Sequence, residues 1–324
     1  MFWMFSDLGM VSRWRIARDS LARFILLVRR GYRSPPYHNW RHGFTVAHFA
    51  YLVLRNSSLL ARGLLTHIEA FALMIAAMCH DLDHRGTNES YQISSNSVLA
   101  CLYSSEGSVM ERHHFAQSMC ILNTEGCNIL ESLGKADYTR CLDLIRDNIL
   151  ATDIAHHLRA VPEMEAMVRS GPEVGRERHH FLLSSLLMTS ADLSDQTKAW
   201  TNARHSAKLV YSEFFTQGDL EKAMGNKPQD NMDREKAFIP GDQINFIDHI
   251  VLPVYRMLRD LDSSTAGAYQ AVVRNKNYWV SMKNILEERG VKERMDVMDI
   301  FQVVAKDYKI VGYEETTCPE SVWE

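Results

Sequence analysis

The sequence predicts an all-α fold, a compact assembly of many helices. Residues 37–161 contain no proline, so nothing in this stretch forces a helix to end. Apolar residues recur every three or four positions from Ile68 to Cys79 and again from Phe181 to Met188, which is the spacing of a helix face. Few segments show the alternation typical of a half-buried strand. Long proline-free stretches with this periodicity favour helices along most of the chain.

We expect one main domain over residues 31–285, with a lead segment at 1–30 and a tail at 286–324. The 324 residues are 46% hydrophobic and 23% charged, which is ordinary for a globular protein with a large core. Apolar periodicity fades near the carboxyl end, which predicts a partly helical, poorly packed tail. Between Gly218 and Asp242, three glycines and two prolines predict a long loop.

Charge and composition exclude several classes of partner. The net charge is -4 and no segment concentrates Lys and Arg among aromatic residues, so we expect no nucleic acid partner. The longest apolar run, Phe71 to Cys79, is too short to cross a bilayer, and the first residues lack the pattern of a secretory signal. Six scattered cysteines without a Cys-x-x-Cys pair indicate a reducing compartment. We expect a cytoplasmic protein, with peripheral membrane contact as the alternative.

The segment His80-Asp81-Leu82-Asp83-His84 carries four ionisable side chains directly after the apolar run that ends at Cys79. A core helix that ends in this way delivers its polar groups to a buried place, where charges need partners or a metal ion. On composition alone, a helix end capped by charged residues in water explains the pattern equally well.

A second histidine pair, His38 and His42, follows Pro35-Pro36. Prolines suit a helix start, and residues four apart share one helix face, so we expect both imidazoles to point to one site. Paired imidazoles at this spacing are a common way to present nitrogen ligands to a metal. Taken alone, the pair is more simply explained as two partly exposed histidines beside Trp40.

Asp192 ends the apolar run that starts at Phe181, so its carboxylate is expected to be buried. A buried carboxylate is costly unless it is paired or bound to a metal, and a salt bridge to an Arg or Lys is the alternative. With His42, His80 and Asp81 it completes a set of two histidines and two carboxylates from three helices, which suits zinc.

Asp81 can bridge to a second ion held mainly by water, as Mg²⁺ or Mn²⁺ prefers. Two such ions generate a bridging hydroxide at neutral pH and clamp phosphoryl oxygens. His38 then lies outside the ligand set but beside it, where it can protonate a departing alkoxide. The residues therefore predict a two-metal hydrolase of phosphate esters.

Several of these motifs resemble one known family. The string His80-Asp81-Leu82-Asp83-His84-Arg85-Gly86-Thr87-Asn88 resembles the signature of the class I 3′,5′-cyclic-nucleotide phosphodiesterases, and Tyr37-His38-Asn39-Trp40-Arg41-His42 resembles its other hallmark. The runs 102–117, 194–198 and 217–226 are similar to the cyclic GMP-stimulated, dual-specificity branch. The similarity spans roughly residues 20 to 285 and implies a compact, multi-helix catalytic domain of the HD type.

The resemblance also implies roles for individual residues. His42, His80, Asp81 and Asp192 match the ligands of the tight metal ion. His38 matches the proton donor, and His84 matches the residue that orients the bridging hydroxide. The positions that hold waters of the second metal fall on Glu111 and Thr152. The positions of the nucleotide pocket fall on Tyr37, Ile154, Asp195, Gln196, Val210, Phe214, Met232, Gln243 and Phe246.

The purine clamp that the resemblance places on Gln243 and Phe246 also makes chemical sense. An amide offers one acceptor and two donors, so it pairs with adenine in one orientation and with guanine in the other. Phe246, three residues later, falls on the same helix face and can stack on the base. Without the resemblance, an ordinary surface amide and a core aromatic explain these two residues better.

The expected function is hydrolysis of cAMP, cGMP or both to nucleoside 5′-monophosphates, which ends cyclic-nucleotide signalling. The alternatives are an HD-type metallophosphohydrolase acting on other nucleotides and a catalytically silent cyclic-nucleotide receptor. The oligomeric state is open, with a homodimer among the options. The pairs His113-His114, His156-His157 and His179-His180 are expected at the surface or behind the metal ligands, because adjacent helix residues point apart.

Overall fold

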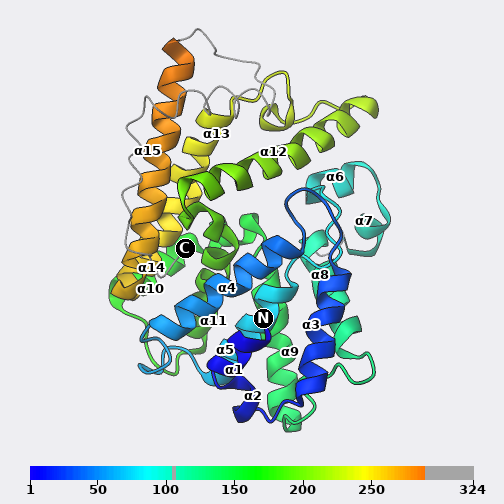
Figure 1. The fold of residues 1–324 in the computed structure, drawn as a ribbon, viewed down its shortest axis with the longest axis vertical. Coiled ribbons are helices and arrows are strands. Elements are labelled where there is room, and N and C mark those ends of the chain that lie inside the picture. Colours follow the sequence, from blue (N-terminus) through cyan, green and yellow to red (C-terminus); the bar gives the residue numbers. More distant parts are fainter. Residues whose placement is uncertain (104–106, 289–324) are drawn as a thin grey trace. The chain divides into compact units, whose positions relative to one another are not determined.

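In the computed structural model, all regular elements of the described residues are helices, which confirms the predicted fold class (Figure 1). The structure describes residues 1–103 and 107–288. Its α-helices are α1 Phe2–Asp7, α2 Met10–Arg13, α3 Arg18–Gly31, α4 Trp40–Asn56, α5 His67–Cys79, α6 Glu89–Ser94, α7 Val98–Tyr103, α8 Val109–Leu122, α9 Lys135–Leu150, α10 Ile154–Ser170, α11 Glu177–Asp192, α12 Trp200–Ala223, α13 Ile239–Phe246, α14 Leu252–Leu261 and α15 Ala266–Glu288. The described residues also form the short 3-10 helices η1 Leu193–Thr197, η2 Asp230–Met232 and η4 Ser263–Thr265, and the π-helix η3 Ile247–Val251.

The chain divides into two compact units. Among the described residues, the first holds Met1–Ser194 with Met257–Thr265, and the second holds Asp195–Arg256 and residues 266–288. Residues 1–30, expected as a lead segment, form α1, α2 and most of α3 within the first unit. Of the expected tail, residues 286–288 continue α15, and the rest lies outside the described residues.

Helix α5 forms the core of the first unit. Every residue of α5 except His67 is buried, as expected for a helix that is apolar on all sides. It begins with a capping box, in which the Thr66 hydroxyl accepts from the Glu69 N–H and the Glu69 carboxylate accepts from the Thr66 N–H. Helices α4, α9 and α11 pack against it. Within the described ranges, no helix combines the length and apolarity that a membrane span requires.

The second unit corrects the expected loop at Gly218–Asp242. Helix α12 continues through Gly218 to Ala223, and α13 already begins at Ile239. The glycine serves packing rather than a turn, because a Cβ there would lie 2.1 Å from the carbonyl oxygen of Met232. Only the segment between these helices follows the predicted loop, and it contains the short 3-10 helix η2.

Candidate metal centre

Four side chains from separate parts of the first unit converge on one point. His42 lies in α4, His80 and Asp81 directly follow α5, and Asp192 is the last residue of α11. The Nε2 atoms of His42 and His80 are 3.1 Å apart. Asp192 Oδ1 lies 3.0 Å from His42 Nε2 and 3.2 Å from His80 Nε2. Asp81 Oδ2 lies 3.4 and 3.3 Å from the same two nitrogens.

The separations and the burial of these four side chains are explained better by a bound divalent cation than by hydrogen bonds among the side chains themselves. Ligand atoms about 2.0–2.2 Å from one tetrahedral ion are separated by about 3.3 Å, close to the separations seen here. Asp81 Oδ2 is buried and has no hydrogen-bond partner among the described residues. A buried carboxylate oxygen without a partner is costly, and a cation would remove that cost. The set of two imidazoles and two carboxylates suits zinc or a similar ion.

The orientation of His80 prepares its Nε2 for coordination. Its Nδ1 lies 3.0 Å from the carbonyl oxygen of Ala77, where it donates a hydrogen bond and leaves Nε2 facing the cluster. Burial lowers the pKa of His80, but the negative charges of Asp81 and Asp192 outweigh it and hold the pKa well above its usual value. The same contacts, with His80 as the largest attractive partner, offset burial and lower the pKa of Asp81 and of Asp192.

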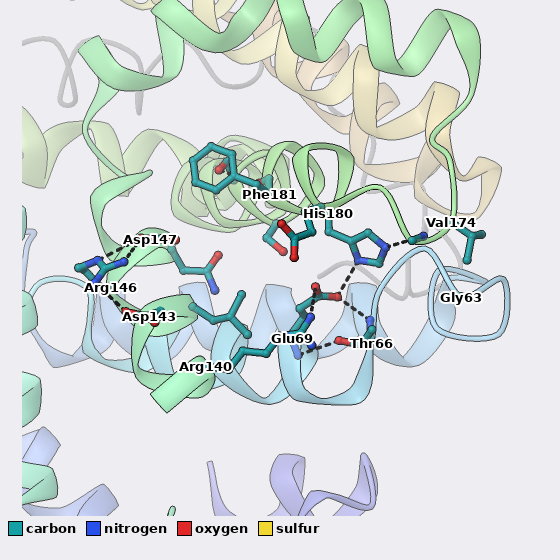
Figure 2. A pocket seen from close by; sticks show the side chains of 16 residues that line it. Gly63, Thr66, Glu69, Arg140, Asp143, Arg146, Asp147, Val174, His180 and Phe181 are labelled. Atoms are coloured by element: carbon teal, nitrogen blue, oxygen red, sulfur yellow. Dashed lines mark hydrogen bonds and ion pairs between the residues drawn. The ribbon is translucent and has the colours of Figure 1, made fainter. Parts of the chain in front are cut away.

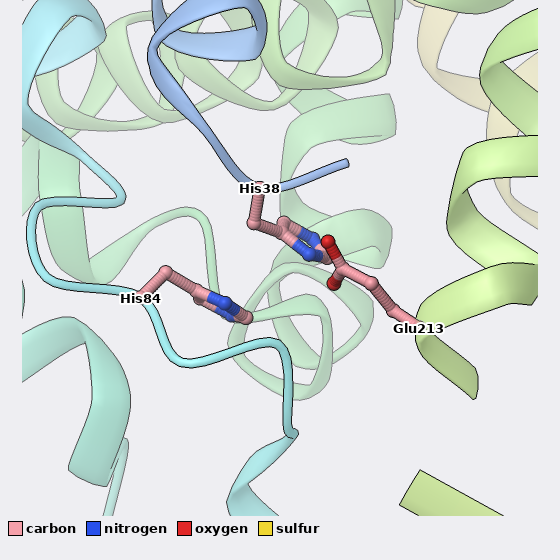
Figure 3. Close-up of side chains that lie close together, drawn as sticks. All are labelled: His38, His84 and Glu213. Atoms are coloured by element: carbon pink, nitrogen blue, oxygen red, sulfur yellow. The ribbon is translucent and has the colours of Figure 1, made fainter. Parts of the chain in front are cut away.

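His38 lies beside this cluster, but it does not share a helix with His42 as expected. Helix α4 begins only at Trp40, because Asn39 caps it: the Asn39 Oδ1 accepts from the Arg41 N–H at 2.8 Å. The ring of His38 instead stacks on His84, with centroids 4.1 Å apart (Figure 3). The expectation that one helix includes both His38 and His42 was therefore wrong, because the helix begins two residues after His38.

Tyr37 and His84 complete the surroundings of His38. The Tyr37 ring centroid lies 4.8 Å from that of His38 and 4.6 Å from that of His42. Burial, followed by the charge of His38, holds the pKa of His84 well below its usual value, so its ring is neutral at pH 7. His84 Nδ1 accepts from the Gly86 N–H at 3.0 Å, which leaves its ring proton on Nε2.

A second potential cation position adjoins the first. Asp81, His84 and His114 each offer a ligand atom within 4.8 Å of the others, so Asp81 belongs to both groups. His114 was expected at the surface or behind the ligands, and the structure buries it: its Nδ1 lies 2.6 Å from the Leu82 carbonyl and its Nε2 lies 3.7 Å from Asp81 Oδ1. Its spacing of three residues from Glu111, on one helix face, was the signal available in the sequence.

Glu111 lies in the first turn of α8, grouped with two other carboxylates, Glu89 and Asp153. Burial raises the pKa of Glu111 to about 8, and the charges of Asp153 and Glu89 act in the same direction. Glu111 Oε2 has no hydrogen-bond partner in the described part of the chain. Thr152 and Ile154 flank Asp153, and the Thr152 hydroxyl donates to the Ile149 carbonyl at 2.7 Å.

The remaining candidate residues belong to the second unit. Asp195 and Gln196 form part of η1, and Met232 ends η2, where its sulfur lies 3.3 Å from Gln217 Nε2. Four residues lie as two helix pairs, namely Val210 and Phe214 on α12 and Gln243 and Phe246 on α13. The Gln243 Oε1 atom is buried and has no hydrogen-bond partner among residues 1–103 and 107–288.

A separate cavity of about 720 Å³ lies at the opposite end of α5, between α5, α9 and α11 (Figure 2). The Glu69 carboxylate lies at its wall and accepts from the Thr66 N–H at 2.7 Å, His180 Nδ1 at 2.9 Å and Arg140 Nη2 at 3.4 Å. Glu69 is eleven residues from His80 along one helical path, which corresponds to about 16 Å. None of the residues that line this cavity was expected in the site.

The fold and the cluster together define an all-helical domain whose converging histidines and aspartates could hold a divalent cation. Residues 37–272 match the sequence model of the 3′5′-cyclic nucleotide phosphodiesterase family. The chain belongs to this family, which confirms the family resemblance found in the sequence.

Individual relatives agree with this assignment. The chain is 40% identical over 294 residues to the dual 3′,5′-cyclic-AMP and -GMP phosphodiesterase 11 of Drosophila melanogaster, covering 90% of the chain and 20% of that protein. It is 39% identical over 287 residues to a cGMP-specific 3′,5′-cyclic phosphodiesterase of Drosophila virilis, covering 88% of the chain and 32% of that protein. The chain thus spans between a fifth and a third of the length of these relatives.

A solved structure supports the fold. The crystal structure of the phosphodiesterase domain of Salpingoeca rosetta rhodopsin phosphodiesterase superposes with a TM-score of 0.82 at 28% sequence identity. The superposition covers 89% of this chain and 87% of that one. The all-helical architecture is therefore that of a phosphodiesterase domain.

Proposed function

We propose that this chain hydrolyses the 3′,5′-cyclic phosphodiester of cAMP, cGMP or both to a nucleoside 5′-monophosphate. The observation that carries the proposal is the convergence of His42, His80, Asp81 and Asp192 beside His38, in a chain that belongs to a phosphodiesterase family. Cleavage of the O3′ bond leaves an alkoxide that needs a proton, and a neighbouring imidazole is a suitable donor.

The metal ligands proposed are His42, His80, Asp81 and Asp192 for Zn²⁺, with Asp81 shared with Mg²⁺ or Mn²⁺. When bound, two divalent ions supply a water ionised near neutral pH and charge that offsets the phosphoryl oxygens. The protein holds these four ligands in place before binding, through buried helix ends and the hydrogen bond from His80 to Ala77.

Three further side chains act on protons and water. His38 donates its proton to O3′ as the ester bond breaks, and its stacking on His84 fixes the plane of the ring. The neutral His84 is proposed to orient the attacking water by donating a hydrogen bond from Nε2, because its Nδ1 already accepts from the Gly86 N–H. Glu111 and Thr152 are proposed to bind ordered water, since the Glu111 Oε2 has no other partner among the described residues.

The second unit is proposed to recognise the base. Gln243 pairs with either purine through its amide, and Phe246 on the same face of α13 stacks on the ring. Val210 and Phe214 supply apolar contact from α12. The residues proposed to shape the rest of the pocket are Tyr37, Ile154, Asp195, Gln196 and Met232.

We also propose that the protein acts in the cytoplasm. The five cysteines in the described part of the chain are all free thiols, which supports a reducing compartment.

The test is a turnover assay on the purified chain, with cAMP and cGMP supplied separately and the 5′-monophosphate quantified. We expect product from at least one nucleotide, complete loss after treatment with a chelator, and recovery on adding Zn²⁺ with Mg²⁺ or Mn²⁺. Hydrolysis of deoxynucleoside triphosphates or alarmones alone would favour the other HD-type activity, and tight cAMP or cGMP binding without product would favour a receptor.

A further inference from the structure

Asp83 lies within the turn that carries the proposed metal ligands His80 and Asp81, but it belongs to none of the groups of potential ligand atoms found among the described residues. Its backbone has a positive φ of 63°, in the left-handed region that is costly for most residues and least so for Asn, Asp and Gly. The turn that contains Asp83 places Asp81, two residues before it, and His84, directly after it, in the same group of potential ligand atoms. A conformation of this kind persists only where the surroundings hold it.

Both oxygens of the Asp83 carboxylate are engaged by side chains from other elements. Oδ1 accepts from Arg33 Nε at 2.5 Å, in the segment that follows α3. Oδ2 lies 2.7 Å from His113 Nε2, on α8, and 3.5 Å from Arg85 Nη2. Both oxygens of Asp83 are therefore engaged, and its carboxylate links the turn to α8 and to the segment that follows α3.

The backbone of the turn is held at the same place. The Asp83 N–H donates to the Gly31 carbonyl at 3.0 Å. Gly31 permits this approach, because a Cβ there would lie 2.8 Å from Leu82 Cδ2. On the opposite side, His114 bonds the Leu82 carbonyl, so the neighbours His113 and His114 both hold the turn although their side chains diverge.

We propose that Asp83 is a positioning residue for the metal centre, and that Arg33 and His113 are its partners. The carboxylate fixes the left-handed turn, and the turn fixes the directions of Asp81 and His84. This inference deepens the proposed function, because it assumes that the converging ligands bind a cation. Outer contacts that orient ligands in this way typically change metal affinity by about 10–100-fold when removed.

Three substitutions distinguish the contribution of the left-handed backbone conformation from that of the carboxylate. Asp83→Gly accepts the left-handed conformation but has no carboxylate, and Asp83→Ala lacks both properties. Asp83→Asn tolerates the conformation and keeps the size but removes the charge. Asn96→Ala is the matched control, because Asn96 is exposed and has a similar φ of 51° in another turn.

The experiment measures Zn²⁺ affinity of the metal-stripped chain by competition with a chromophoric chelator, together with the thermal midpoint and with kcat and KM for cAMP and cGMP. We expect Asp83→Gly and Asp83→Ala to weaken Zn²⁺ binding about 10-fold or more, with Asp83→Asn in between. At saturating metal, kcat should fall while KM changes little. His113→Gln and Arg33→Gln should follow the same direction, and Asn96→Ala should lower only the thermal midpoint.

The inference is overturned if Asp83→Gly and Asp83→Ala bind Zn²⁺ within threefold of the unsubstituted chain while their thermal midpoints fall as in Asn96→Ala. Should Asp83→Ala not fold by circular dichroism, the near-isosteric Asp83→Asn and the His113→Gln variant carry the decision. Zn²⁺ affinity does not depend on turnover. If the unsubstituted chain binds Zn²⁺ but cleaves neither cyclic nucleotide, the proposed function fails and the affinity series still decides the role of Asp83.

Discussion

The Nε2 atom of His42 lies 3.0 Å from Oδ1 of Asp192, although 150 residues separate them in the chain. Both side chains are placed by buried helices, α4 and α11, which pack against each other and against α5. Rigid packing of helices can hold ligand atoms at fixed separations before any ion binds, which lowers the entropic cost of binding. The centre is therefore preorganised by the core of the first unit.

Asp192→Asn is expected to weaken Zn²⁺ binding by about 100-fold, the upper end of what outer contacts contribute, because it removes a direct ligand charge. Zn²⁺ affinity of the stripped protein, measured by chelator competition, checks this. Asp230→Asn is the control, since Asp230 is an exposed carboxylate paired with Lys236. Equal Zn²⁺ affinity in Asp192→Asn and the unsubstituted chain would contradict the assigned ligand set.

His38→Gln is expected to lower kcat by about 10²–10⁴-fold, the usual contribution of a general acid, while leaving metal content unchanged. The reason is that His38 stacks on His84 outside the ligand set, so the substitution removes a proton donor and no ligand. Steady-state kinetics and metal analysis of the same sample check both parts. His67→Gln, at an exposed position at the start of α5, is the control, and an unchanged kcat in His38→Gln would remove its role.

Gln243→Ala is expected to raise KM for both cAMP and cGMP by about 10-fold, since each base loses hydrogen bonds worth about 1–1.5 kcal/mol. The buried Oε1 atom of Gln243, which has no hydrogen-bond partner in the described part of the chain, motivates the expectation. Initial rates over a range of each nucleotide provide the measurement. Gln270→Ala changes an exposed glutamine of α15 and should leave both KM values as they are. If KM stays constant for both nucleotides, Gln243 does not clamp the base.

The residues proposed as metal ligands could be picked out in the sequence, and the structure brings them together, because local pattern and burial act together at these positions. His80 and Asp81 follow α5 and Asp192 ends α11, two helices rich in buried apolar residues, and ionisable groups in such places require partners. The burial of a helix end can be inferred from the residues that precede it. The convergence of these two ends with His42 of α4 could be expected only because the donor set is chemically complete.

Other features depend on competition between local signals or on distant packing. Pro35-Pro36 suggested a helix that includes His38, but the Asn39 cap delayed its start. The contact of His113 with Asp83 joins residues 30 positions apart, and helix periodicity gives no information on which turn α8 meets. Tertiary contacts of this kind override local preference, as they do where Gly218 continues a helix.

Glu69→Gln is expected to lower the free energy of unfolding at pH 7 by about 1–3 kcal/mol, since the buried carboxylate accepts from Thr66, His180 and Arg140. Burial alone would raise the pKa of Glu69, but the hydrogen bonds from Thr66 and His180 lower it. Because the pKa of Glu69 is lower in the folded state than in the unfolded state, where it is near 4.5, ionised Glu69 stabilises the fold at pH values above 4.5. This stabilisation is lost as the pH falls through the folded-state pKa.

Urea unfolding of both proteins at pH 7 and pH 4 checks the prediction for Glu69. The difference between them should shrink at the lower pH. Glu173→Gln, at an exposed carboxylate paired with Arg176, is the control and should change stability little at either pH. A difference that grows on acidification would contradict the lowered pKa.

Glu111→Gln, in contrast to Glu69→Gln, is expected to raise the free energy of unfolding of the metal-free protein at alkaline pH. Burial raises the pKa of Glu111 to about 8, so its carboxylate is disfavoured in the folded state. The stability that this group contributes is therefore complete below the unfolded pKa, near 4.5, and is lost as the pH rises through about 8. The amide does not ionise, so Glu111→Gln should be more stable than the unsubstituted chain at pH 8, by at least about 1 kcal/mol.

Urea unfolding in the presence of a chelator, at pH 5 and pH 8, measures this difference. The advantage of Glu111→Gln should be small at pH 5 and clear at pH 8. Glu125→Gln replaces an exposed carboxylate and should follow the unsubstituted chain at both values. Parallel stability profiles for Glu111→Gln and the unsubstituted chain would mean that Glu111 is solvated in the folded state. In that case, its proposed role in holding water beside Asp81 would lose its electrostatic basis.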